Sequence, residues 1–515
     1  MTENASWGRG YPVLHPYPPA WHNFVAPPHL AAICALCGVA WEVGPDQPMV
    51  IADIACGTGY TAAVLAAGNP NAKVIGLDYN PAHIAEGRSL AAEAGLTNLH
   101  YVEADLAEMQ AAEIDALPEF DLVVVHGLWS WVADPVRDGL VRLLARRVKP
   151  GGVVMLSYNA LPGASGAMGL ARLVRGALLA AGGDTAAGLA AARAQVNAVL
   201  EAEAQHLPPS SWRRALLDRA TPRSEGYMLH EFLTAHWRPA FFADVAMALA
   251  GARLDHVGSA TIAENLPAMN LTPAQQALWH AAPDAEAREL VVDLCVQRAF
   301  RRDVFVRGAR AIRREPAVAD IMMATTSLSA EHPTLITQAG QAELPPALIG
   351  PIRDALALRP HRIGELLALP GCDTATPSEL LCLLIGSGAA QPVWRMPGSG
   401  QGWEDARDAA RRLNQAAARR YAPHGMGQGM FALASPALGG GASAEPTELA
   451  VMALLARLAP DHAGQRAWAA DLPALIRELV PPGPPPLPEV LADLQSVIGT
   501  ILADRLGAHQ ALEIL

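Results

Sequence analysis

Five apolar runs separated by helical stretches constrain the fold of residues 50–160 more than any other feature of the sequence. Each run is nearly continuous in Val, Ile and Leu, which is typical of strands buried on both faces. The stretches between them, notably 80–94 and 135–147, have the pattern of helices. Strands alternating with helices predict a parallel, doubly wound sheet with helices on both faces. The runs are MVIADIA, AKVIGLDY, LHYVEADL, FDLVVVHGL and GGVVMLSY.

The rest of the chain predicts further units, because 515 residues exceed what a single core usually holds. Residues 348–394 have the helix, turn, helix and strand order of a winged-helix module. We expect an N-terminal segment over 1–30, the sheet domain over 31–165, a helical connector over 166–220, a second unit over 221–308 and a mainly helical, winged-helix-like region over 309–515.

Charge and cysteine content exclude several classes of protein. A net charge of −12 disfavours a general nucleic-acid binder, which needs a basic surface. Six cysteines in so long a chain do not make a disulfide scaffold, so a reducing compartment is expected. Neither a signal peptide nor a transmembrane run is evident. We therefore expect a soluble, cytoplasmic protein, whose oligomeric state the sequence leaves open.

Three short motifs suggest sites but have simpler explanations. The pair Cys34 and Cys37 has no second ligand pair and lies on an apolar helix face, where it is expected to pack. HEFLTAH, residues 230–236, lacks the i, i+4 histidine pair of a zinc protease, so no metal site is expected. A run of arginines is more typical of a solvated face than of an anion site; its members are Arg301, Arg302, Arg307, Arg310, Arg313 and Arg314.

The loop in VIADIACGTGY, residues 50–60, bears most directly on function. Gly57-x-Gly59-x-x-Ala62 fits a dinucleotide fingerprint, in which glycines let the backbone approach a pyrophosphate at a helix N-terminus. However, Asp53 ends the preceding strand, and its carboxylate would repel a pyrophosphate. It would suit a cationic ligand group, such as an amino group or a sulfonium. The loop therefore favours a cationic cofactor over a nicotinamide one.

Two further carboxylates follow in order. Asp78 ends the next strand, at the spacing where a carboxylate accepts ribose hydroxyls, and Asp105 ends the third. The fourth and fifth predicted strands follow, in the stretches FDLVVVHG and VKPGGVVMLSY. Together these motifs resemble the class I S-adenosylmethionine-dependent methyltransferases over about residues 50–160, where Ala55 replaces the first glycine of the family's motif. We expect this alanine to need a negative φ and to cost some affinity.

The resemblance can be narrowed. Residues 126–163, 227–267 and 300–308 are similar to bacterial methyltransferases that carry a methyltransferase regulatory domain, including the rickettsial protein-lysine methyltransferases. At position 164 this chain has alanine, whereas the family usually has tryptophan. The identity of the methyl acceptor therefore stays open.

The resemblance and the chemistry agree on an S-adenosylmethionine site. Asp53 and the Gly57 to Gly59 backbone are expected at the amino-acid moiety, Asp78 at the ribose, Tyr79 against adenine and Asp105 at its amino group. The full predicted set is Asp53, Ala55, Cys56, Gly57, Gly59, Asp78, Tyr79, Ala104, Asp105, Leu106 and His126.

For the acceptor we expect His126 at the end of the fourth strand, where doubly wound sheets bind their ligands. Tyr158 and Asn159 end the fifth strand, and their oxygens would accept hydrogen bonds from a neutral amine. Three functions stay open: a protein-lysine methyltransferase, a small-molecule N- or O-methyltransferase, and a non-enzymatic regulator that senses the cofactor and binds a partner or DNA.

Overall fold

The computed structural model describes residues 8–13, 17–218, 225–327, 333–400, 402–421, 430–459, 461–479 and 488–514. The first residues of the N-terminal segment and the boundary expected at 221 lie outside these ranges.

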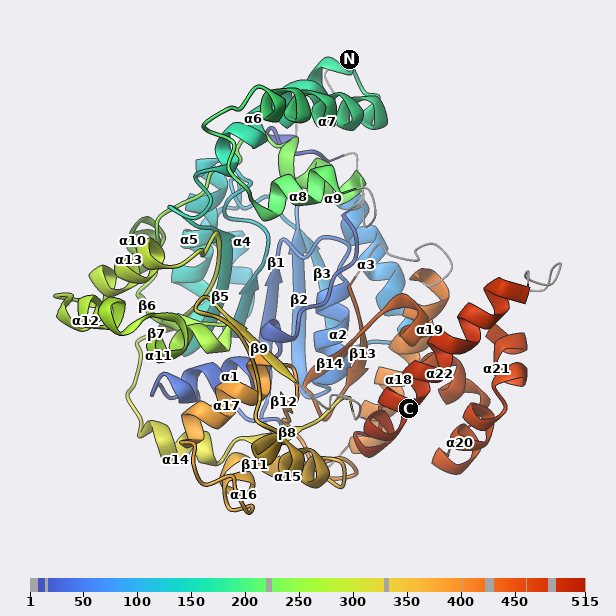
Figure 1. The fold of residues 1–515 in the computed structure, drawn as a ribbon. Helices are drawn as coiled ribbons and strands as arrows, with labels where there is room; N and C mark the ends of the chain where they lie inside the picture. The colour runs from blue at the N-terminus through green and yellow to red at the C-terminus, as the bar shows by residue number, and fades with distance from the viewer. Residues whose placement is uncertain are drawn as a thin grey trace.

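A seven-stranded sheet forms the centre of the molecule, with strand order β3-β2-β1-β4-β5-β7-β6 (Figure 1). Strands β1 to β5 are parallel to one another, whereas β7 is antiparallel to both β5 and β6. The five apolar runs of the sequence are these first five strands. The strands are β1 (Met49–Ile54), β2 (Ala72–Asp78), β3 (Leu99–Glu103), β4 (Phe120–Val125), β5 (Val148–Asn159), β6 (Leu254–Ser259) and β7 (Phe300–Arg307).

The sheet crosses the divisions that the sequence suggests at 165 and 221. Its last two strands, β6 and β7, come from the range 221–308, and β7 pairs with β5 from Val153–Val306 to Asn159–Phe300. The second unit therefore completes the sheet of the first.

Alternate residues of each strand point to opposite faces, as strand geometry requires. On one face, Ile51, Val74 and Val124 pack with α1 (Pro27–Leu36), α2 (Tyr60–Gly68) and α3 (Pro81–Ala94). On the other, Ala52 and Val123 pack with α4 (Ala111–Ala116), α5 (Asp134–Arg147) and α10 (Phe242–Ala250). The short 3-10 helix η2 (Asn23–Val25) precedes α1, whose Cys34 is buried in the first core.

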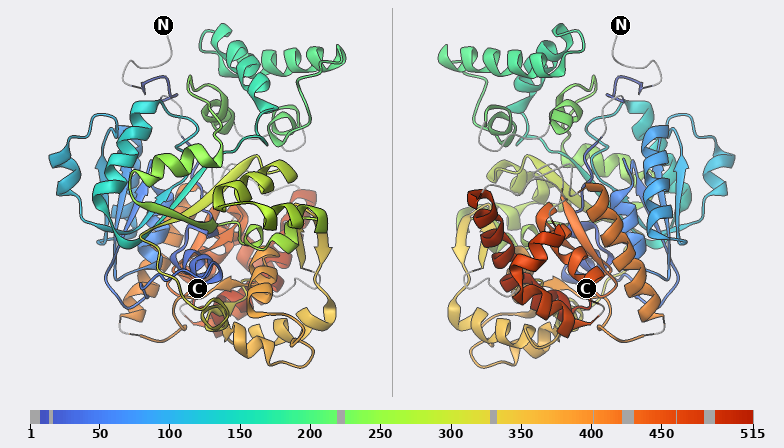
Figure 2. Two further views of the ribbon diagram at one scale, coloured as in Figure 1. Left: turned by 90° about the vertical axis from the view of Figure 1, so that its left-hand side faces the viewer. Right: turned by 90° about the vertical axis from the view of Figure 1, so that its right-hand side faces the viewer.

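Four helices between β5 and β6 form an arm that projects from the sheet (Figure 2). They enclose a small core of their own, which includes Leu170, Val174, Leu189 and Phe232. The helices are α6 (Ala167–Ala180), α7 (Thr185–Glu201), α8 (Ser211–Leu217) and α9 (Glu225–Phe232). Between β6 and β7 lie η3 (Ile262–Asn265), α11 (Pro267–Asn270), α12 (Pro273–Ala281) and α13 (Ala285–Cys295).

The region expected to be winged-helix-like, residues 348–394, contains a helix, a short strand, two further helices and a second short strand. A small sheet of order β11-β8-β12 accompanies its helices, and the hairpin β9–β10 precedes them. The elements are α14 (Arg314–Ala319), β8 (Met322–Ala324), β9 (Thr334–Thr337), β10 (Gly340–Glu343), α15 (Pro346–Leu356), β11 (His361–Arg362), α16 (Ile363–Leu367), α17 (Pro377–Gly386) and β12 (Gln391–Pro392).

The C-terminal region packs on the α2–α3 side of the sheet. Helix α2 approaches the hairpin β13–β14 so closely that a Cβ on Gly68 would lie 2.4 Å from the Gly440 nitrogen. Tyr60 donates its hydroxyl hydrogen to the Ala432 carbonyl. The elements are α18 (Trp403–Tyr421), β13 (Phe431–Ser435), β14 (Gly440–Ala444), α19 (Pro446–Leu458), α20 (His462–Ala470), α21 (Leu472–Leu479) and α22 (Pro488–Ala511).

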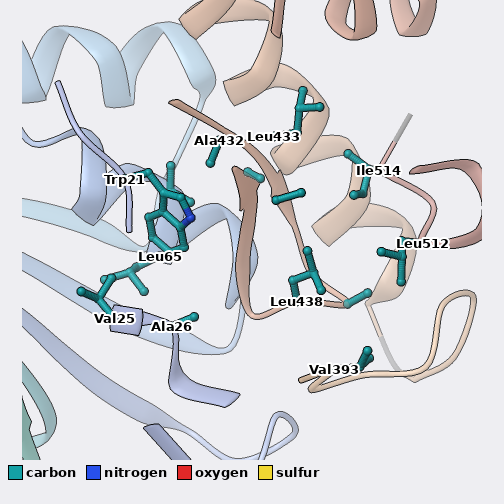
Figure 3. Close-up of a cluster of buried hydrophobic side chains, with 14 of the residues drawn as sticks. Trp21, Val25, Ala26, Leu65, Val393, Ala432, Leu433, Leu438, Leu512 and Ile514 are labelled. Carbon is teal, nitrogen blue, oxygen red and sulfur yellow. The ribbon is translucent and has the colours of Figure 1, made fainter. Parts of the chain in front are cut away.

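One buried cluster joins the two ends of the chain to the sheet domain (Figure 3). Trp21 of the N-terminal segment and Leu65 of α2 lie in it, as do Leu433 of β13 and Ile514 near the C-terminus. Within the described ranges, no helix is long and apolar enough to cross a membrane.

Candidate active site

A pocket lies at the carboxyl ends of β1, β2 and β4, where ligands bind in open α/β sheets. We call it the strand-end pocket. All residues predicted to bind the cofactor line it except Gly59. The N-terminal segment contributes Arg9, Tyr11, Tyr17 and His22 to the same lining.

Asp53 supplies a buried carboxylate at the end of β1. Its side chain is 4 % exposed, and its Oδ2 atom has no hydrogen-bond partner among the described residues. Burial, and then the nearby Asp78, raise the pKa of Asp53 to about 7. A buried carboxylate oxygen without a donor is costly unless a ligand supplies one. A cationic amino group of a ligand would satisfy it.

Asp78 ties the two neighbouring loops together. Its Oδ2 accepts a hydrogen bond from the Gly57 N–H at 2.9 Å, and its Oδ1 accepts from the Asn80 N–H at 2.9 Å. Asn80, not Asp78, caps helix α3. Each carboxylate oxygen has two lone pairs, so Asp78 retains acceptor capacity for ribose hydroxyls.

Gly59 contributes through its backbone. Its φ is +81°, and a Cβ there would lie 2.5 Å from the Tyr101 ring. The Tyr101 hydroxyl donates to the Gly59 carbonyl at 2.7 Å. Only glycine therefore fits the start of helix α2 at this point.

The expectation that Ala55 needs a negative φ is wrong, because its φ is +59°. The left-handed turn lets the next residue, Cys56, donate its N–H to the Leu77 carbonyl at 3.0 Å. Ala55 thus adopts a left-handed backbone conformation that normally favours glycine. This conformation destabilises the folded protein by roughly 1–2 kcal/mol.

Ala55→Gly is accordingly expected to raise the free energy of unfolding by roughly 0.5–1 kcal/mol. The variant removes the strain at this position, but glycine also increases the entropy of the unfolded chain, which offsets part of the stabilisation. Affinity for S-adenosylhomocysteine should stay the same or increase. Thermal unfolding and calorimetric titration measure the two quantities. Ala52→Gly in β1 is the matched control and should lower stability; an equal loss for both variants would contradict the strain at Ala55.

Asp105 lies at the mouth of the pocket and is already engaged by the N-terminal segment. Arg9 Nε donates to Asp105 Oδ2 at 3.0 Å, and Arg9 Nη2 donates to Glu108 Oε1 at 2.6 Å. Both Arg9 and Asp105 are about one-third exposed, so the pair contributes little to stability. The pair acts locally, because it holds the N-terminal segment against the pocket. Tyr79, Ala104 and Leu106 line the pocket beside this pair.

The same segment is anchored to the end of α9 and to the residues that follow it. The Ala235 N–H donates to the Gly10 carbonyl at 2.8 Å, and His236 Nε2 lies 2.8 Å from the Arg9 carbonyl. His230 Nδ1 lies 3.0 Å from the Tyr11 hydroxyl. HEFLTAH is therefore a docking site for the N-terminal segment. Where side chains are described, no group of three or more His, Cys, Asp or Glu residues could hold a metal ion.

His126 lies in the strand-end pocket as predicted, at the end of β4. Its Nδ1 is 2.8 Å from Ser157 Oγ, and its Nε2 is 3.1 Å from Nε2 of His22. Burial lowers the pKa of His126 well below its usual value, and His22 and Arg302 lower it further. The imidazole is therefore neutral at neutral pH.

The acceptor-facing position predicted for Tyr158 needs correction. Tyr158 is fully buried, does not line the strand-end pocket and donates its hydroxyl hydrogen to Asp303 Oδ2 at 2.6 Å. Asn159 is also buried and does not line the pocket; its N–H donates to Ser130 Oγ at 2.8 Å. Tyr158 and Asn159 are successive strand residues and point to opposite faces of the sheet, and neither lines the strand-end pocket.

One member of the arginine run, Arg301, is internal, whereas Arg310, Arg313 and Arg314 are exposed. Arg301 is 1 % exposed and forms ion pairs with Asp293, Asp303 and Glu289. Arg302 packs over the Phe24 ring at 4.8 Å. Arg301 therefore neutralises buried carboxylates and belongs to no basic surface.

A second cavity of about 630 Å³ adjoins the strand-end pocket. Segments far apart in the sequence form its walls, and His22 lines both cavities. Its lining includes Phe24 and His29 near the N-terminus, Arg302 of β7, Ile385 of α17, Ser443 of β14, Glu448 of α19 and Arg505 of α22.

The sequence did not single out Arg9, Tyr11, Tyr17 or His22. The only available signal was the density of aromatic and histidine residues over 11–24, in a stretch too rich in proline for a long helix. Such a stretch has neither helix nor strand periodicity, so the sequence does not show which of its side chains face the pocket.

Comparison with protein families decides the class of this chain. Residues 51–152 match the family model described as methyltransferase domain, and residues 224–307 match the predicted methyltransferase regulatory domain. The chain is an S-adenosylmethionine-dependent methyltransferase. The regulatory match includes β6 and β7, so in this methyltransferase it contributes to the central sheet.

Two uncharacterized proteins are similar to this methyltransferase. One, from Synechocystis sp., is 28% identical over 404 residues, which cover 75% of this chain and 77% of that protein. Another, from Rickettsia prowazekii, is 30% identical over 29% of this chain and 57% of its own length. A trans-aconitate 2-methyltransferase from Deinococcus radiodurans is 32% identical over 22% of this chain and 40% of its own length.

Among solved structures, PKMT2 from Rickettsia typhi in complex with AdoHcy has the same fold. The TM-score is 0.66 at 17% identity, and the match covers 95% of this chain and 98% of that one. S-adenosylmethionine is the cofactor of this methyltransferase.

Proposed function

We propose that this methyltransferase transfers methyl groups to lysine side chains of proteins. The second cavity carries the proposal, because it adjoins the strand-end pocket and provides room for a segment of acceptor protein. Its walls use the N-terminal segment, the regulatory range, the winged-helix-like module and the C-terminal helices.

The environment between the cavities suits an amine. A lysine amine has a pKa near about 10.4 in water and must lose a proton before it can act as a nucleophile. In the lining of the second cavity, Arg302 disfavours the charged form of an amine beside it, whereas Glu445 and Glu448 attract a cation. Next to Arg302 the neutral amine is favoured, and orienting that amine is the main contribution of the chain.

For the cofactor we propose the roles expected from the sequence. Asp53 would accept hydrogen bonds from the amino group and Asp78 from the ribose hydroxyls. Tyr79 would pack on adenine, and Asp105 would accept from the adenine amino group. S-adenosylmethionine supplies an electrophilic methyl group when bound, and the His126 side chain would lie beside that group.

The fold likeness to PKMT2 supports the proposal, since it extends over the segments that form the second cavity as well as the sheet. The sequence resemblance to rickettsial protein-lysine methyltransferases supports it too. The alternative of DNA binding through the winged-helix-like module is disfavoured, because α17 is packed against α14 and η3 and its Leu380, Leu381 and Leu384 are buried.

Incubation with methyl-labelled cofactor and a bacterial lysate tests the function. We expect label in discrete protein bands that yields methyl-lysines on acid hydrolysis, and no label with Asp78→Ala. Label confined to small molecules would instead indicate the small-molecule methyltransferase, and label in proteins on other residues would contradict lysine as the acceptor. We further propose a cytoplasmic location, since all six cysteines are unpaired.

A further inference from the structure

His22 occupies the junction of the two cavities. It lines both of them, and no other residue of the described ranges does so. His22 immediately precedes η2, which places the ring opposite the end of β4, with its Nε2 3.1 Å from Nε2 of His126. Any group that passes from the second cavity into the strand-end pocket therefore meets this imidazole.

The junction is built to hold the ring in one place. Phe24 stacks on His22 with the ring centroids 4.8 Å apart, and His126 meets His22 edge-on at 4.5 Å. Behind them, Ser157 Oγ contacts His126 Nδ1 at 2.8 Å and accepts the Gly127 N–H at 3.1 Å. A side chain fixed by two rings and a hydrogen bond can orient a ligand without losing much entropy.

Charge at the junction comes from Arg302, whose guanidinium lies 4.8 Å above the Phe24 ring. Burial and Arg302 lower the pKa of His22 to about 4, so its ring is uncharged at neutral pH and can accept a hydrogen bond. Its Nδ1 has no partner among the described residues, whereas its Nε2 is engaged by His126.

We propose that the acceptor amine reaches the strand-end pocket from the second cavity, and that His22 Nδ1 accepts a hydrogen bond from it and aims its lone pair. The inference rests on the proposed function. It requires the tautomer in which His22 carries its proton on Nε2 and donates it to His126. His22 is then a positioning residue that takes up no proton, and Arg302 keeps the approaching amine in its neutral form.

Three substitutions of His22 test the hydrogen bond. His22→Gln keeps an acceptor, His22→Leu removes it, and His22→Arg adds a charge that repels a cation. The probe is n-butylamine, a mimic of the lysine side chain, titrated into protein saturated with S-adenosylhomocysteine and followed by NMR saturation transfer. His100→Gln is the control, since His100 is exposed on β3.

We expect His22→Leu and His22→Arg to weaken butylamine binding at least about tenfold. His22→Gln should stay within about threefold of the parent, and His100→Gln should equal it. Parent-like binding by His22→Leu, or equal losses for Gln and Leu, would refute the hydrogen bond. In ¹⁵N-histidine spectra of the parent, a protonated His22 Nδ1 would refute it as well.

The route through the second cavity needs its own variant. Ser443 lines that cavity and is exposed, so Ser443→Trp should narrow it without opening the core. Protein labelling from the lysate is expected to fall at least about tenfold, with affinity for S-adenosylhomocysteine unchanged. Ser399→Trp, in an exposed turn away from the cavity, should label like the parent.

The outcomes separate the two proposals. If the parent labels no protein, the proposed function fails, while butylamine binding still reports on His22. If the parent labels protein lysines and Ser443→Trp does so at the same rate, the function stands and the route through the second cavity is wrong.

Discussion

Asp78→Ala is expected to weaken binding of S-adenosylhomocysteine at least about tenfold, because hydrogen bonds to a charged group are worth roughly 1.5–3 kcal/mol each. The variant removes the acceptors proposed for the ribose hydroxyls. It also removes the partner of the Gly57 N–H, so the loop after β1 loses part of its support. Calorimetric titration of the purified protein measures the effect.

Asp115→Ala is the matched control for this prediction. Asp115 pairs with Arg146 on the exposed face of α4, away from the strand-end pocket, and its removal should leave the affinity unchanged. Tight binding of NADH that Asp78→Ala weakens, with no response to S-adenosylhomocysteine, would contradict the interpretation of the whole loop.

Arg301→Leu is expected to lower the free energy of unfolding by about 3–5 kcal/mol, the usual effect of removing one partner from a buried ion pair. Asp293 and Asp303 each have a side chain about 1 % exposed and would lose their bonds to the guanidinium. The position of Asp303 also fixes Tyr158 on β5. Urea unfolding of the two proteins measures the difference.

Arg310→Leu serves as the control for Arg301→Leu. Arg310 pairs with Glu42 at the surface, where both side chains are more than half exposed, so the expected change is at most about 1 kcal/mol. Similar midpoints for both variants would show that the buried network contributes no more than a surface pair.

The sheet and its carboxyl edge could be predicted because their signals are local. Each of β1 to β5 is a continuous apolar run, and a polar residue after such a run must lie where the strand ends. Parallel strands bring those ends to one edge, so the sequence predicts that Asp53, Asp78 and His126 lie together, and all three line the strand-end pocket.

Other features depend on contacts between distant segments. Strands β6 and β7 join the sheet after an insertion of about ninety residues, and a sequence pattern does not show which sheet a strand joins. Tyr158 was placed at the acceptor because the end of β5 was known, but its direction depends on Asp303, 145 residues later. His22 lies in a stretch without period, and only its packing on Phe24 and His126 indicates its position.

The sign of φ at Ala55 was missed for a different reason. Steric rules favour negative φ for alanine, whereas here the hydrogen bonds of Cys56 and Gly57 to the next strand hold the loop in the left-handed turn. Tertiary bonds overrode the preference of the residue.

The two ends of the helical arm meet beside the sheet. Ala160 after β5 and Ala240 before α10 form a bridge, with the Leu161 N–H donating to the Ala240 carbonyl and the Ala240 N–H to the Asn159 carbonyl. The arm also has its own core. Eighty residues can therefore leave and rejoin the sheet at nearly one point. The lengths of α6, α7 and α8 can therefore change while every strand is kept, whereas the end of α9 holds the N-terminal segment and the rest of the regulatory range is fixed in place by β6 and β7.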